Sequence, residues 1–200
     1  MINSLYSLRK NQRAFTLVEL LIVVGIIAIL AAIAIPQFNT YRKRGYDASA
    51  NADLRNIKTI EEALYADFTD YGASDSVPHA GISFTASAEV GPGGLVWLSG
   101  GRTTSIPLYF SLSPTVHAAV KVFFNGQSNT AYNIVTAHEM GDLFYGTDSD
   151  ATTLYRKGMP GTGYTAGMVL SNCPASTFGV DDFASLGAMW TPACTSLKKV

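Results

Sequence analysis

The three histidines are the first residues to test for catalysis or metal binding, and they lie far apart in the sequence. His79, His117 and His138 share no metal-ligand spacing with one another. His138 and Glu139 begin like the zinc pattern H-E-x-x-H, in which two histidines one helical turn apart hold the metal. Position 142 is Asp142, so the second ligand is missing. We interpret these histidines as surface or strand residues and predict no catalytic residue, metal ligand or cofactor.

Other patterns that carry chemistry are also incomplete. Asp142, Asp148 and Asp150 lack the glycine and the distal glutamate of a calcium-binding loop, so a solvated turn is expected there. The glycines of residues 158–167 lack the strand-to-helix context that a nucleotide-binding loop requires, so a turn-rich loop is expected there. The chain contains neither G-x-S-x-G nor GK[ST]. A net charge of −1 provides no basic field for nucleic acid. The sequence therefore indicates no enzyme and no specific nucleic-acid site.

The strongest chemical signal is one carboxylate in an apolar segment. Residues 20–41 contain no charged side chain, and 21 residues run from Phe15 to the position before Pro36. A helix of that length is about 32 Å long, close to the thickness of a membrane's hydrocarbon layer. Glu19 lies within this segment, where a carboxylate costs several kcal/mol unless it is neutralised or paired. A signal peptide or a plain membrane anchor has no use for such a carboxylate. A helix that packs in register beside identical helices does have a use for it, because the buried charge needs a positive partner that only one position supplies.

The N-terminus allows three interpretations. The basic residues flanking the segment number three on each side, so they do not set its orientation in a membrane. An ordinary signal peptide cut after Ala34, a permanent membrane anchor, and cleavage before a retained apolar helix all agree with composition. Glu19 favours the third interpretation.

Residues 13–38, RAFTLVELLIVVGIIAILAAIAIPQF, resemble the N-terminal segment of type IV pilins. The resemblance continues to Gly72 and is closest to the short pilins of metal-reducing bacteria. It implies that a prepilin peptidase cuts between Ala14 and Phe15, that the new amine of Phe15 is methylated, and that Glu19 pairs with the Phe15 amine of a neighbouring subunit. Ala14 departs from the usual glycine. Where those pilins read AIIGILAA this chain reads GIIAILAA, so Gly25 and Pro36 would supply any bend of the helix.

The resemblance also implies partners and a location. The partners are identical subunits in a helical homopolymer, the peptidase, an inner-membrane platform with its ATPase, an outer-membrane secretin, and membrane lipid before assembly. The chain would cross the inner membrane once and then join an extracellular pilus. Motility, adhesion, DNA uptake and electron transfer all stay open as roles of that pilus. The alternatives are a pseudopilin of a type II secretion system, a minor adhesive tip pilin, and a secreted enzyme with an ordinary signal peptide.

The chain divides into four predicted parts. Residues 1–14 are a leader, 15–36 a membrane-spanning and filament-core helix, 37–71 an amphipathic continuation, and 72–200 a globular head. A helical stripe runs along the continuation, and its opposite face is charged. The stripe is Leu54, Ile57, Leu64, Phe68 and Tyr71; the opposite face is Arg55, Lys58, Glu62 and Asp70. The predicted fold class is α+β, with one long helix packed on an antiparallel sheet.

The head contains the predicted strands and both cysteines. β-Branched and aromatic residues favour strands at 106–112 and 116–124, a return strand at 131–137, and weaker strands at 154–156 and 168–170. Residues 72–94 suit a loop. Cys173 and Cys194 allow one disulfide, which oxidation outside the cytoplasm favours and which would stabilise the head by about 3 kcal/mol. The pilin resemblance strengthens this pairing, because many pilins close a C-terminal loop in this way.

Overall fold

The computed structural model describes residues 15–75, 89–91, 95–100, 106–125, 128–161, 163–186 and 189–192. The chain separates into two compact units, Met1–Tyr41 and Arg42–Val200. Helix α1 (Leu17–Phe68) contributes to both, close to the helix predicted from residue 15 to about 70. It continues through Pro36, where the Thr40 hydroxyl donates to the Pro36 carbonyl at 3.1 Å.

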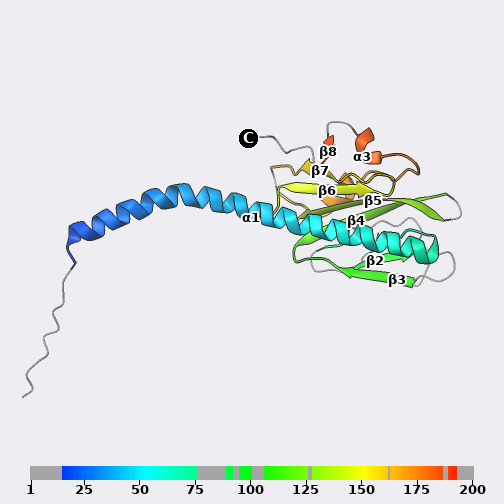
Figure 1. Cartoon of the computed structure of the whole chain (residues 1–200), viewed down its shortest axis with the longest axis horizontal. Helices are drawn as coiled ribbons and strands as arrows, with labels where there is room; N and C mark the ends of the chain where they lie inside the picture. The colour runs from blue at the N-terminus through cyan, green and yellow to red at the C-terminus, as the bar shows by residue number, and fades with distance from the viewer. Residues whose placement is uncertain are drawn as a thin grey trace, which may run out of the picture. The chain divides into compact units, whose positions relative to one another are not determined.

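The described residues of the second unit form two antiparallel sheets and two short helices besides α1 (Figure 1). The first sheet is β1 (Ala73–Asp75), β2 (Leu95–Gly100) and β3 (Ile106–Ser111), in that order. The second is β4 (Val116–Phe124), β5 (Asn129–His138), β6 (Leu143–Asp148), β7 (Tyr155–Gly158) and β8 (Thr191–Pro192). Helices α2 (Met168–Asn172) and α3 (Asp182–Ser185) lie between β7 and β8 in the sequence. The α+β class is confirmed.

Several sequence expectations for the head need correction. Residues 168–170 form part of α2, not a strand, and Ser171 N–H donates to the Gly167 carbonyl at 3.0 Å within that short helix. Three apolar residues fit a strand and a helix equally well, so the pattern could not separate them. The expected loop at 72–94 contains β1, and its residues 76–88 and 92–94 lie outside the described part. Strands β2, β6 and β8 were not expected, and the head has two sheets instead of one.

The apolar stripe of α1 packs on one face of the large sheet, as its spacing predicts. Leu54, Ile57 and Leu64 are fully buried and share a core with side chains of β4 and β5. Thr136 on β5 donates a hydrogen bond to the Ala50 carbonyl at 2.8 Å, which fixes the helix against the sheet. Asp70, expected on the solvated face, is buried instead, and its carboxylate accepts from the Asn129 N–H.

The other face of the large sheet builds a second core. Val135 and Ala137 on β5 pack there with Phe144, Phe183 and other apolar side chains from β6 and the C-terminal helices. Strand β5 is therefore buried along almost its whole length, with alternate residues facing different cores.

Buried carboxylates tie the helix to the loops of the head. Asp47 accepts from the N–H groups of Asp142 and Leu143 at 3.0 and 3.2 Å, and Asp53 accepts from the Ser113 N–H at 2.8 Å. Asp148, expected in a solvated turn, is buried and accepts from the Ala151 N–H. These bonds fix the ends of strands beside the helix, which positions the groove described below.

Candidate functional site

The first unit displays an apolar helical surface. Its large apolar side chains are between 51 % exposed, at Val23, and 83 % exposed, at Phe15. Helix α1 is also long and apolar enough to cross a membrane. Burying one such side chain contributes about 1.5–3 kcal/mol, so this surface strongly favours an apolar environment such as lipid or other helices.

Glu19 is the acidic residue of the first turn of α1, and its own helix end supplies its hydrogen bonds. One carboxylate oxygen of Glu19 accepts from the Thr16 N–H at 3.0 Å and from the Thr16 hydroxyl at 2.9 Å. In return, the Glu19 N–H donates to the Thr16 hydroxyl at 3.2 Å. This reciprocal arrangement is a capping box, which satisfies N–H groups that no helical carbonyl reaches. Sequence analysis missed Thr16, although the spacing Thr-x-x-Glu is the known signature of this cap.

The other predicted residues of this segment are placed as follows. Phe15 is exposed immediately before the helix, and Ala14 lies outside the described residues. Gly25 and Pro36 both lie inside the continuous helix, and a Cβ built on Gly25 would meet nothing within 4 Å. The cleavage site, the methylation and the bend therefore stay predictions.

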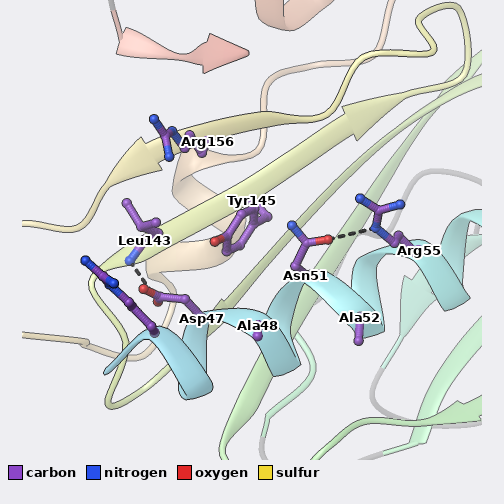
Figure 2. A pocket seen from close by; sticks show the side chains of 9 residues that line it. Asp47, Ala48, Asn51, Ala52, Arg55, Leu143, Tyr145 and Arg156 are labelled. Carbon is purple, nitrogen blue, oxygen red and sulfur yellow. Dashed lines mark hydrogen bonds between the residues drawn. The ribbon is translucent and has the colours of Figure 1, made fainter. Parts of the chain in front are cut away.

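A groove lies on the head between α1 and residues of β6 and β7, with a volume of about 590 Å³. Figure 2 shows Asp47, Asn51 and Arg55 on the helix, Tyr145 opposite them on β6, and Arg156 farther away on β7. Arg55 Nε donates to the Asn51 side-chain oxygen at 2.9 Å. Arg44 also lines the groove, so three arginines and one aspartate give it a net charge of 3 − 1 = +2.

His117 on β4 lies between two carboxylates. Its Nδ1 is 3.3 Å from Glu89 Oε1, and its Nε2 is 2.8 Å from Glu139 Oε1. Burial alone would disfavour the charged imidazole, but the hydrogen bonds to both carboxylates raise the pKa of His117 above its usual value. Both ring nitrogens face acceptors, so the imidazolium form fits this geometry. Glu89 also accepts from the Tyr164 hydroxyl and the Leu170 N–H.

His138 on β5 has a different environment. Its Nδ1 accepts from the Met140 N–H at 3.0 Å, and its Nε2 lies 2.8 Å from the Thr115 hydroxyl. Burial lowers the pKa of His138. His117 and His138 are thus strand residues, as expected, while His79 lies outside the described residues. Within the described ranges, no cluster of three or more histidine, cysteine or acidic side chains is arranged to hold a metal ion.

Cys173 is buried at the end of α2, and burial raises the pKa of its thiol to about 12. Its Sγ lies 3.5 Å from the Asn133 carbonyl. Cys194 lies outside the described residues, so the Cys173–Cys194 pairing stays a prediction.

The N-terminal segment of this chain is similar to segments of known proteins. A family model described as "Prokaryotic N-terminal methylation motif" matches residues 9–35. A "Fimbrial protein" of Pseudomonas aeruginosa is 50 % identical over 54 residues, 27 % of this chain and 35 % of that protein. The "Type IV major pilin protein PilA" of Myxococcus xanthus is 42 % identical over 61 residues, 30 % of this chain and 28 % of that protein. The "Type IV major fimbrial protein FimA" of Dichelobacter nodosus is 37 % identical over 98 residues, 44 % of this chain and 63 % of that protein.

These matches cover about a third of the length of the first two relatives. The matched motif includes Ala14, Phe15, Glu19 and Gly25. The finer likeness to pilins of metal-reducing bacteria stays a prediction. The N-terminal segment of this chain is thus similar to that of type IV pilins and carries the methylation motif, and the chain also has an α+β head.

Proposed function

We propose that this chain is a structural subunit of a type IV pilus. The observation that carries the proposal is the apolar surface of residues 15–41, which is exposed in the isolated chain and bears Glu19 as its single charge. Lipid covers this surface before assembly, when the chain crosses the inner membrane once. The helices of other copies cover it in an extracellular filament. The relatives named as major pilins and fimbrial proteins support the same role.

Assembly follows from the chemistry of the helix end. Cleavage between Ala14 and Phe15 creates a positive amine, which is the counter-charge that Glu19 requires in an apolar filament core. Apolar burial supplies the cohesion, and the pairing of Glu19 with a neighbour's Phe15 amine sets the register. The peptidase, the membrane platform with its ATPase, and the secretin belong to this proposal.

The structure adds a second role for Glu19, which is to cap its own helix. An experiment must separate this role from the role of setting the register between neighbouring subunits. Glu19 caps its own helix through Thr16, so its loss weakens the helix end as well as any contact with a neighbour. Replacing Thr16 with valine removes the two hydrogen bonds of the Thr16 hydroxyl from this cap, and it keeps the Glu19 carboxylate and the bond that this carboxylate accepts from the Thr16 N–H. The pair Glu19→Ala and Thr16→Val therefore distinguishes capping from pairing.

The test is filament assembly in a piliated host that lacks its own major pilin. Mass spectrometry of the processed chain should find a methylated Phe15 at the N-terminus, whereas a start at Ile35 would indicate a secreted protein. We expect Glu19→Ala to be cleaved but to form no filaments, and Thr16→Val to form them. Equal loss in both variants would refute the register role. Filaments that form only inside the envelope would favour the pseudopilin alternative.

A further inference from the structure

The Glu89 carboxylate joins three parts of the head. Its Oε1 lies 3.3 Å from His117 Nδ1 on β4, and it also accepts from the Tyr164 hydroxyl. The Gly167 N–H donates to the same oxygen at 3.1 Å, and the Leu170 N–H donates to Oε2 at 3.0 Å. Gly167 is the N-cap residue of α2 and has no side chain with which to cap it. Glu89 therefore supplies, from a segment 78 positions earlier, the acceptor that the start of α2 needs.

The elements that meet at Glu89 are also held on the large sheet. Val90 exchanges two backbone hydrogen bonds with Ala118 on β4, at 2.9 and 3.1 Å. Helix α2 buries Val169 completely in the second core, together with Cys173 at its end. A change that weakens the bonds of Glu89 will therefore loosen α2 and residues 89–91 at the same time.

The strength of this junction depends on the charge of one imidazole. The side chains of His117 and Glu89 are both almost fully buried. Burial opposes the charged form of Glu89, but the hydrogen bonds that it accepts outweigh burial and lower its pKa to about 2. Glu89 is thus ionised at every ordinary pH, and among its described donors His117 is the one that carries a charge. When His117 loses its proton, a buried carboxylate loses its counter-charge.

The groups around His117 leave it no neutral form that satisfies both neighbours. Glu89 faces Nδ1, and Glu139, which follows β5, faces Nε2 at 2.8 Å. The Tyr164 ring lies 4.2 Å from the imidazole, measured between ring centroids, and the nearby His138 on β5 is the other titratable group on this side. A neutral imidazole has one N–H, so it can donate to only one of the two carboxylates. Glu139 is partly exposed and can turn to water, whereas Glu89 can reach water only if the structure around it opens.

We propose that Glu89, His117 and Glu139 form a pH-operated clasp, which holds residues 89–91 and α2 on the large sheet while the imidazole is charged and releases them when it loses its proton. The release is local, because α1 packs on the other face of the sheet. It makes the buried Val169 side chain and the Cys173 thiol accessible to solvent. This inference goes beyond the proposed function and does not depend on whether the chain forms filaments.

The test is hydrogen exchange of the full chain in detergent, measured by mass spectrometry from pH 6 upwards. Each rate is divided by the intrinsic rate of that amide at the same pH. We expect the protection of the Leu170 amide to decline as the pH rises, while the Ile134 amide in the middle of β5 keeps its protection. At pH 6, His117→Gln should lower the protection of Leu170 by about a hundredfold, the lower end for loss of one partner of a buried ion pair. The wild-type and variant values should approach each other as the pH rises.

Two further variants separate the clasp from general destabilisation. Glu139 is one of the groups that raise the pKa of His117, so in Glu139→Gln the decline should begin at a lower pH. This variant also keeps the test decisive if His117→Gln does not fold. His138→Gln is the matched control, because it makes the same change on the neighbouring strand, where the ring bonds to Met140 and Thr115 instead of Glu89. It should keep the wild-type decline.

Thiol labelling gives an independent readout. Cys194→Ser leaves Cys173 as the single thiol of the chain. At pH 6, N-ethylmaleimide should label Cys173 faster when His117→Gln is added, and the two rates should converge at higher pH. Comparison at equal pH cancels the ionisation of the thiol itself. A protection of Leu170 that does not change with pH in the wild type, or an equal decline in His117→Gln, would overturn this inference. A parallel loss of protection at Ile134 would also overturn it, because the whole head would then be unfolding.

Discussion

The Glu89–His117 pair allows a prediction whose size follows from burial. The side chains of His117 and Glu89 are 8 % and 9 % exposed, so Glu89→Gln removes one partner of a buried ion pair. It also places an amide where Glu89 now accepts from Tyr164, Gly167 and Leu170. Removing one partner of such a pair costs about 3–5 kcal/mol, and we expect the lower end because Glu139 still faces the imidazole.

The matched control is Glu139→Gln. The Glu139 side chain is 36 % exposed and contacts the same imidazole from the other side. Exposed pairs contribute about 1 kcal/mol or less. For a chain of this size, 1 kcal/mol shifts the melting temperature by about 2–4 °C. We therefore expect a decrease of about 6–12 °C for Glu89→Gln and of at most about 4 °C for Glu139→Gln.

The assay is thermal unfolding of the full chain in detergent at pH 6, followed by near-ultraviolet circular dichroism. Far-ultraviolet spectra at 20 °C should match those of the wild type, because both variants keep the size of the side chain. Equal decreases for the two variants would show that burial does not set the strength of this pair. A decrease below 3 °C for Glu89→Gln would refute the reasoning in the same way.

Three further predictions concern the head. The raised pKa of His117 means that its stabilisation is complete below pH 6.5 and is lost as the pH rises through the folded-state pKa, so His117→Gln should remove a decline in melting temperature that begins above pH 6.5. Burial raises the pKa of Glu61 well above its usual value, so this group makes wild-type stability fall as the pH rises from 4.5; a smaller fall is expected for Glu61→Gln, and an unchanged slope would contradict the burial argument. A Cβ on Gly146 would lie 2.8 Å from Cζ of the buried Phe183 ring, so Gly146→Ala should cost about 1–3 kcal/mol in urea unfolding, whereas Gly158→Ala, with no atom within 4 Å of the new Cβ, serves as the control.

Strong periodicity explains which elements could be predicted. The bounds of β4 followed from its β-branched and aromatic residues, and those of α1 followed closely from the apolar segment and the apolar stripe. Strand β6 was missed because Gly146 interrupts its pattern, and the structure explains that glycine by the close approach of Phe183. Helix α2 was assigned as a strand because a run of three apolar residues has no readable period.

One candidate site could be predicted from the sequence, and the other could not. The N-terminal segment is contiguous, so its residues could be identified from the sequence, and Thr16 was available from its spacing to Glu19. The groove lined by Arg55 and Arg156 could not be found from the sequence, because Arg156 comes from a strand 101 positions after Arg55. Only the packing of α1 beside β6 and β7 brings them together.

Strand β5 has a consequence for how mutations in this head should behave. Ile134 and Thr136 face the long helix, while Val135 and Ala137 face the C-terminal layer. Truncating Ile134 or Thr136 will therefore weaken the packing of the large sheet on helix α1. Truncating Val135 or Ala137 will instead weaken the packing of the C-terminal segment around α3 on the sheet, while the contact between the sheet and α1 stays intact. A scan of four consecutive residues thus separates two modes of partial unfolding within a single strand.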